Sequence, residues 1–230
     1  MNLNMNIKEK REAGFTLLEL LIVVSIIAIL SVALVLVLDP AETLKKSRDA
    51  QRMSDMSTIK TALGLYLTST STPYLGSSTS TANCKANIAG ATTRIMYSLP
   101  STTSISDPSL DAASGVVALQ SATPSLTDGT GWVPVNLDSL TSGSPISNFP
   151  IDPVNNVAVG ASTAANVTSE ALVYRYACML SPLTFEIDAQ LESTAYTSTE
   201  DKRKSDGGNS DLYYEVGTNL KIVDGDTNAL

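Results

Sequence analysis

The clearest hydrophobic pattern in the chain is an almost unbroken apolar run from Phe15 to Leu38. Glu19 is the only charged residue in the run before Asp39. At about 1.5 Å per residue the run predicts a helix roughly 36 Å long, enough to cross a bilayer core. An acid in such a helix is costly in lipid and normally has a partner. Taken alone, the pattern predicts a membrane-spanning helix, and a plain anchor whose Glu19 reaches the membrane surface is one interpretation.

A second helix is predicted between Lys45 and Leu67 by apolar residues that recur at steps of three or four. These residues are Met53, Met56, Ile59, Leu63 and Leu67. Most of the charged residues in the same segment fall off this apolar face, and for most of them a solvated surface is expected. The charged residues are Lys45, Arg48, Asp49, Arg52, Asp55 and Lys60.

The two helical segments are joined by Asp39-Pro40-Ala41-Glu42, which predicts that the helix restarts. Asp39 suits a cap, Pro40 suits the first helical position, and Glu42 lies where the acid of a capping box belongs. A continuous but kinked helix is also allowed, because Pro40 lacks an amide donor and crowds the preceding turn.

The remaining sequence predicts a sheet after a long polar loop. Two runs alternate between apolar and polar residues, Ala171–Cys178 and Thr184–Ala189, and Ser181–Pro182 lies in the loop between them. In the second run Glu186 and Asp188 fall on the face opposite the apolar residues. Further strands are expected in two later segments, and two earlier segments suit short strands or helical turns. The later ones are Tyr213–Gly217 and Leu220–Val223, and the earlier ones are Ile95–Leu99 and Gly115–Leu119.

These patterns predict an α+β fold in which an antiparallel sheet packs over the C-terminal half of the long helix. The expected organisation has five parts: a leader, an apolar helix, its amphipathic continuation, a Ser/Thr-rich loop region with short elements, and a C-terminal sheet region with a tail. Their bounds are 1–14, 15–38, 39–67, 68–148 and 149–230.

Composition narrows the functional classes. The net charge of −8 argues against nucleic-acid binding as the main task. The chain has no histidine, which removes the usual general base and the commonest metal ligand. There is no phosphate-binding glycine loop of the P-loop type. We therefore expect no enzymatic activity.

The two cysteines, Cys84 and Cys178, are the only ones in the chain. In an oxidising compartment an even pair suggests one disulfide, which has a single possible connectivity. Two separate buried thiols are the alternative.

The residues Gly14-Phe15-Thr16-Leu17-Leu18-Glu19, followed by the apolar run, resemble the class III signal of type IV pilins and type II secretion pseudopilins. The resemblance implies that a prepilin peptidase cleaves between Gly14 and Phe15 and that the amino group of Phe15 is then methylated. It also implies that the helix leaves the inner membrane to form the core of a homo-oligomeric filament. The pilin family's ladle-shaped fold is the corresponding structural expectation.

The same resemblance gives Glu19 a role in assembly. In the family, the acid is thought to pair with a neighbouring subunit's terminal amine and so set the register between subunits. The implied partners are the peptidase, an assembly platform and its ATPase. A surface pilus is the favoured assembly, and a periplasmic secretion pseudopilus is the alternative, since Pro150-Ile151-Asp152-Pro153 resembles a turn of many pseudopilins. A monomeric membrane-tethered binding domain is a third interpretation.

One oxygen-rich loop is a candidate calcium site. Asp206, Asn209 and Asp211 lie around a Gly-Gly turn and offer the hard oxygen ligands that Ca²⁺ prefers. Major pseudopilins often bind calcium in a C-terminal acidic loop, so the resemblance points the same way. A solvated turn without metal is the alternative, and no other cofactor is expected.

Overall fold

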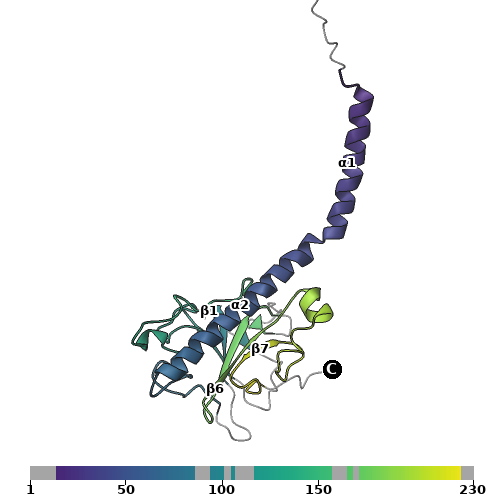
Figure 1. Ribbon diagram of the computed structural model, residues 1–230. Helices are drawn as coiled ribbons and strands as arrows, with labels where there is room; N and C mark the ends of the chain where they lie inside the picture. The colour runs from purple at the N-terminus through teal and green to yellow at the C-terminus, as the bar shows by residue number, and fades with distance from the viewer. Residues whose placement is uncertain are drawn as a thin grey trace, which may run out of the picture. The chain divides into compact units, whose positions relative to one another are not determined.

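The computed structural model describes residues 14–85, 94–100, 105–106, 117–156, 165–167 and 171–223. Residues 1–13 of the predicted leader lie outside the described residues. The chain divides into two compact units, Met1–Thr43 and Leu44–Leu230, and each is considered by itself. Two helices, α1 (Leu17–Leu38) and α2 (Pro40–Ser69), are followed by strands (Figure 1). The expected α+β class is confirmed.

The predicted helix restart is confirmed at Asp39. This residue has a φ of 34°, in the left-handed region, and it caps the end of α1. Pro40 is the first residue of α2, where its missing amide hydrogen costs nothing. The amide of Glu42 donates to Oδ1 of Asp39 over 3.3 Å, so the side chain of Asp39 also caps α2.

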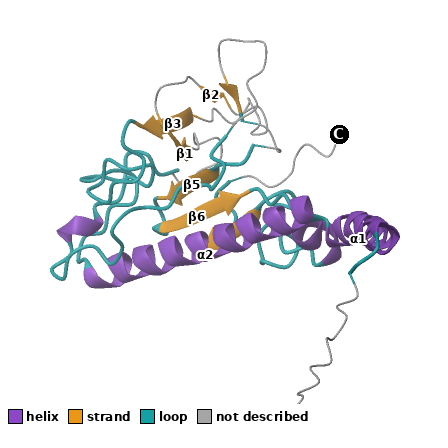
Figure 2. Ribbon diagram, turned by 90° about the horizontal axis from the view of Figure 1, so that it is seen from above, coloured by secondary structure: helices purple, strands orange, loops and turns teal. Residues whose placement is uncertain are grey.

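A five-stranded sheet forms the centre of the second unit, in the order β3-β1-β5-β6-β7 (Figure 2). Neighbouring strands are antiparallel from β1 to β7, and β3 is parallel to β1. The strands are β1 (Arg94–Pro100), β3 (Val117–Ser121), β5 (Tyr174–Met179), β6 (Thr184–Ala189) and β7 (Tyr214–Gly217). Two short strands, β2 (Ile105–Ser106) and β4 (Ala165–Asn166), form a separate pair, and single turns of helix lie at Leu137–Ser139 and Ala195–Thr199.

The strand predictions are confirmed with three changes. The Thr184–Ala189 strand has the expected bounds, whereas the strand expected at Ala171–Cys178 begins only at Tyr174. The two ambiguous early segments contain strands β1 and β3, and residues 115–116 lie outside the described residues. The sheet is therefore not confined to the 149–230 region, because two of its strands come from 68–148. Leu220–Val223 forms a turn and not a strand. Its amides at Ile222 and Val223 donate to a side chain, Oε2 of Glu186, instead of to a strand backbone.

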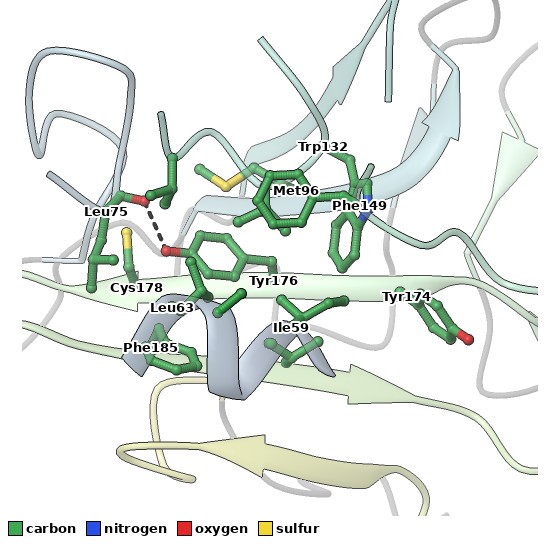
Figure 3. Close-up of a cluster of buried hydrophobic side chains, with 14 of the residues drawn as sticks. Ile59, Leu63, Leu75, Met96, Trp132, Phe149, Tyr174, Tyr176, Cys178 and Phe185 are labelled. Atoms are coloured by element: carbon green, nitrogen blue, oxygen red, sulfur yellow. Dashed lines mark hydrogen bonds between the residues drawn. The ribbon is translucent and has the colours of Figure 1, made fainter. Parts of the chain in front are cut away.

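One face of the sheet packs against α2, as expected. The predicted apolar face of the helix is buried at Met56, Ile59 and Leu63. It contacts inward-facing residues of β5 and β6 and a layer of loop residues (Figure 3). The loop residues include Trp132, which is 1% exposed and donates from Nε1 to the carbonyl of Pro150. Alternating strand residues and one stripe of the helix together make this core.

The opposite face of the sheet is also covered. A second apolar cluster there contains Ile95, Tyr97, Leu99, Val167, Ala171, Val173, Ala177, Ile222 and Val223. The predicted alternation in β6 holds, since Glu186 and Asp188 fall on this second face. Both are nonetheless buried. The amides of Ile222 and Val223 donate to Glu186, and Arg175 forms an ion pair with Asp188.

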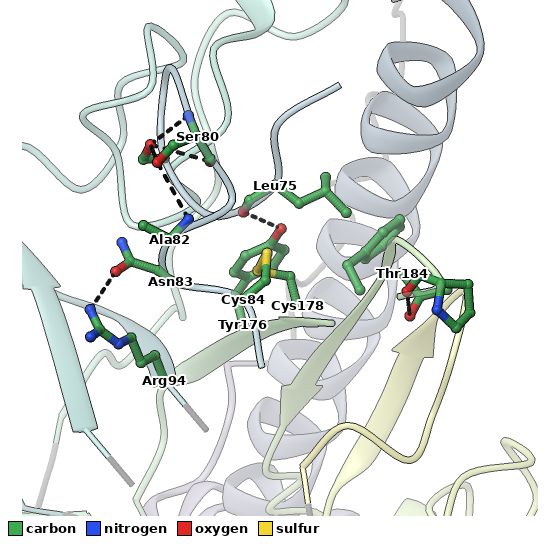
Figure 4. Close-up of a disulfide and its surroundings, with 12 residues drawn as sticks. Leu75, Ser80, Ala82, Asn83, Cys84, Arg94, Tyr176, Cys178 and Thr184 are labelled. Atoms are coloured by element: carbon green, nitrogen blue, oxygen red, sulfur yellow. Dashed lines mark hydrogen bonds between the residues drawn. A yellow bond between two sulfur atoms is a disulfide. The ribbon is translucent and has the colours of Figure 1, made fainter. Parts of the chain in front are cut away.

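The disulfide between Cys84 and Cys178 is confirmed (Figure 4). It links the segment after α2 to β5. A backbone hydrogen bond joins the same two segments, since the amide of Lys85 donates to the carbonyl of Cys178 over 2.7 Å. Beside it, the hydroxyl of Tyr176 donates to the carbonyl of Leu75 over 2.8 Å. The loop after α2 is therefore held to the sheet at two neighbouring points.

Candidate functional site

The predicted processing junction lies just before α1. Gly14, Phe15 and Thr16 are not helical, and α1 begins at Leu17. The side chain of Phe15 is 83% exposed. A Cβ atom added to Gly14 would meet no atom within 4 Å, so nothing in the described part of the fold requires a glycine there. The peptide bond between Gly14 and Phe15 joins two exposed, non-helical residues, so it is accessible to a protease.

Glu19 closes a capping box at the start of α1. The backbone amide and the hydroxyl of Thr16 donate to Oε2 of Glu19 over 2.9 and 2.8 Å. In return, the amide of Glu19 donates to Oγ1 of Thr16 over 3.2 Å. This reciprocal pair satisfies two amides at the helix N-terminus. It places the carboxylate one turn from Phe15, whose nitrogen becomes the chain terminus if the junction is cleaved.

The rest of α1 presents an exposed apolar surface within the first unit. Its described large apolar side chains are 47–87% exposed. Within the described residues, one helical stretch, contained in Leu17–Ser69, is long and apolar enough to cross a membrane. Ser25 and Ser31 do not interrupt this surface, because each donates to a carbonyl of the preceding turn. The helix surface suits lipid or other apolar helices and not water.

The predicted calcium residues each have a protein partner. Asp206 accepts from the amides of Gly208 and Glu215, each over 2.8 Å. Asn209 donates from Nδ2 to the carbonyl of Val223 over 3.4 Å, and Asp211 lies 3.6 Å from Nζ of Lys204. Calcium binding by Asp206, Asn209 and Asp211 as a set stays a prediction.

A charged network near the start of α2 was not expected from the sequence. Arg52 is fully buried and donates to both oxygens of Asp152, over 2.6 and 3.0 Å. Its Nη1 donates to Asp49 and to Glu192, each over 2.7 Å. Arg48 completes the network through two bonds to Glu192, of 2.6 and 2.7 Å. The solvated surface expected for Asp49 and Arg52 is wrong, because two loops cover this part of the helix.

Electrostatics in the network favour the charged forms. Burial alone would lower the pKa of Arg52, but its bonds to Asp152, Glu192 and Asp49 outweigh burial and raise it. The hydrogen bonds from Arg48 lower the pKa of Glu192. Since Asp49 also accepts from the amides of Glu192 and Ser193, the network ties α2 to the 149–155 and 190–193 loops.

These observations define a class: an α+β protein with an uncovered N-terminal apolar helix whose first turn is preceded by an accessible Gly-Phe junction. The comparison with protein families adds that residues 10–35 match the prokaryotic N-terminal methylation motif. This motif is the class III prepilin signal typical of type IV pilins and pseudopilins, so the resemblance noted in the sequence is confirmed. Comparisons with curated proteins and with solved structures gave no match.

The motif has direct consequences for processing and location. It implies cleavage by prepilin peptidase and assembly into a pilus-like structure. Together with the apolar helix it is consistent with insertion in the inner membrane followed by transfer to a filament. Proteins that carry it as pilins are structural and not enzymatic.

Proposed function

We propose that this protein is a structural subunit, the major pilin, of a type IV pilus-like filament that is assembled from the inner membrane and displayed on the cell surface. The observation that carries the proposal is α1. It is an exposed apolar helix long enough to cross a membrane, and most of it lies within the match to the methylation motif at residues 10–35. A surface of this kind is stable in lipid and, after assembly, between the helices of other copies.

The proposed processing step uses Gly14 and Phe15. Because the fold does not require a glycine at position 14, we attribute that residue to recognition by the peptidase. Cleavage leaves Phe15 as the first residue, and its amino group is then N-methylated. The whole of α1 stays on the mature subunit, unlike the apolar core of a secretory signal.

The proposed role of Glu19 follows from the charge that cleavage creates. A new positive amine at the N-terminus of a helix is unfavourable, because the helix dipole already places partial positive charge there. The carboxylate of Glu19, held at this end by Thr16, compensates for it. In a filament core the compensating pair forms between neighbouring subunits. An unpaired charge there costs several kcal/mol, so the pairing fixes the axial register.

The proposal is tested by negative-stain electron microscopy of material sheared from cells, followed by mass spectrometry of the subunit N-terminus. Long filaments whose subunit begins with methylated Phe15 support the major pilin. A processed subunit found only in envelope fractions, without surface filaments, supports instead the major pseudopilin of a type II secretion system. A monomer found in the sheared material and in the envelope fractions, whether processed or not, supports a membrane-tethered binding domain.

The Glu19→Gln variant tests the register argument. It should insert in the membrane and be cleaved like the parent, yet give far fewer filaments. Ser25→Ala is the matched control, since it also changes one polar side chain on α1 but removes only a bond to the carbonyl of Ile22. Normal filament yield from Glu19→Gln would refute the role of the acid.

A further inference from the structure

Three buried carboxylates meet on the sheet face opposite α2. Glu186 and Asp188 lie on β6, and Glu215 lies on β7 directly opposite Asp188 in the strand register. They are 0%, 1% and 2% exposed. One oxygen from each lies within 4.8 Å of those of the other two. Carboxylates gathered so closely away from water require compensation by protons, by cations or by both.

Several hydrogen bonds compensate only part of the cluster. Oε2 of Glu186 accepts from the amides of Ile222 and Val223 over 2.7 and 2.9 Å. Oε1 of Glu186 and Oδ1 of Asp188 are both buried, and in the described part of the chain no hydrogen-bond donor reaches either atom. Contact between the acid groups of Glu186 and Glu215 becomes a hydrogen bond only if a proton is shared. As carboxylates, Glu186 and Asp188 therefore each have one buried oxygen that no donor in the described part of the chain reaches.

The charge of the cluster is also incomplete. Nη2 of Arg175 donates to Oδ2 of Asp188 over 3.0 Å, and the guanidinium stacks 3.5 Å from the ring centre of Tyr213. Within the described residues, Arg175 forms the ion pair with Asp188, and one guanidinium balances only one of three ionised carboxylates. Burial, together with the nearby charge of Asp188, raises the pKa of Glu186 to about 10, and burial raises the pKa of Asp188 to about 7 and that of Glu215 above its usual range.

We propose that Glu186, Asp188 and Glu215 bind one Ca²⁺ ion that stabilises the sheet and the C-terminal segment over it. The two charges of the ion match the two that Arg175 leaves, and the two oxygens without donors supply ligands. The donor set is all oxygen, since the chain has no histidine and both cysteines form the disulfide. Such a set selects hard cations over zinc or copper.

The ligand set favours calcium over magnesium. The carboxylate oxygens lie within 4.8 Å of one another, a span that the metal–oxygen distances of Ca²⁺, about 2.3–2.6 Å, can bridge. Calcium also accepts irregular geometry, which suits three carboxylates fixed by two strands, whereas magnesium requires a near-ideal octahedron.

The 206–210 loop packs closely against the carboxylate of Glu215. A Cβ atom on Gly208 would overlap Oε2 of Glu215, so only glycine leaves room for this carboxylate. The amide of Ser210 donates to the same oxygen over 3.0 Å. Asp206 accepts from the amide of Glu215, which places one residue of the sequence-predicted loop site at the edge of the cluster. The proposal thus moves the calcium ligands from the loop to the strands beneath it.

The experiment uses the full chain in detergent micelles, stripped with EGTA and then titrated with CaCl₂. Calorimetric titration should give about one Ca²⁺ per chain. At about 100-fold excess over Kd the unfolding midpoint, followed by the fluorescence of Trp132, should rise by about 5–10 °C. The same concentration of MgCl₂ should give a smaller rise. Absence of a calcium-dependent rise, or an equal rise with magnesium, overturns the assignment.

Two variants show where the ion binds. Glu186→Gln and Asp188→Asn should each lose the calcium response, whereas the matched control Glu200→Gln, at an exposed acid, should keep it. If Glu186→Gln is more stable than the EGTA-treated parent and calcium stabilises neither protein, protons alone compensate the cluster and the proposal fails. A variant that does not fold leaves the decision to the titration of the parent, which needs no substitution. Calcium response retained by both cluster variants also refutes the site.

Discussion

Arg52→Met should remove the attachment of α2 to the two loops that bury it. Arg52 is fully buried and makes four charged hydrogen bonds, two of them to Asp152. Its loss leaves Asp49 and Asp152, which are 0% and 2% exposed, without their cation. Removing one partner of a buried ion pair costs about 3–5 kcal/mol, mainly because the remaining charge stays buried. For a chain of this size that corresponds to a fall in Tm of roughly 6–20 °C.

The assay for Arg52→Met follows Trp132, the only tryptophan, during thermal unfolding of the full chain in detergent. Trp132 is 1% exposed and lies in the core beneath α2, so its fluorescence reports on the second unit. Arg48→Met is the matched control. Its side chain is 33% exposed and forms its ion pair with the outer carboxylate, Glu192, so a loss of about 1 kcal/mol or less is expected.

A double-mutant cycle separates charge pairing from packing. Because Asp152→Asn removes the carboxylate that Arg52→Met leaves buried, the double variant should be more stable than the sum of the two losses, by at least about 1 kcal/mol. Additive losses would show that the pair contributes through packing alone. A loss below about 1 kcal/mol for Arg52→Met would refute the argument that this network attaches the helix.

The remaining predictions concern the same unit. Reduction of Cys84–Cys178, which closes a separation of 94 residues, should cost about 4–5 kcal/mol in the chain-entropy model, and the Cys84→Ala/Cys178→Ala variant should no longer respond to reductant. Gly131→Ala should destabilise by more than about 1 kcal/mol, because the added Cβ overlaps a backbone carbonyl, whereas Gly64→Ala, in open space on a helix, should stabilise by up to about 1 kcal/mol. Hydrogen bonding lowers the pKa of Glu192 in the folded protein. The contribution of Glu192 to folding stability is therefore fully present above the unfolded pKa of 4.5 and is lost as the pH falls through the lower folded pKa. The stability difference between parent and Glu192→Gln should therefore shrink below about pH 4; a constant difference in urea titrations across that range would contradict the assignment.

Sequence periodicity predicted the features that depend on local spacing. The apolar stripe through Met56, Ile59 and Leu63 and the alternation of Thr184–Ala189 each arise from a repeat that matches one secondary structure, and both are confirmed. The cap at Asp39 is equally local, since it depends on residues no more than three apart. The prepilin motif could be recognised from the sequence because it too consists of neighbouring residues.

Features that depend on long-range cover were not predicted. A charged residue off the apolar stripe of a helix is predicted to be exposed to solvent. Arg52 is instead buried, and its partner Asp152 lies one hundred residues later in the sequence, in a loop that packs against the helix. Glu186 and Asp188 likewise alternate as an outward face, but Ile222 and Val223 return to cover them. Periodicity specifies which face a side chain occupies and carries no information on whether a second layer covers that face.

The second unit buries its apolar side chains, whereas α1 exposes them, and this difference matters for assembly. In the second unit both faces of the sheet are covered by residues of the same chain, which forms two apolar clusters. In α1 the described large apolar side chains are 47–87% exposed, and Glu19 is the one charged residue of the helix. Because apolar helices gain little by moving from lipid to one another, packing alone discriminates poorly between alternative alignments of neighbouring helices. A single charge with one partner per subunit discriminates strongly, since every misaligned copy leaves it unpaired. The proposed filament therefore requires its register information at Glu19, and the yield of Glu19→Gln filaments measures that requirement directly.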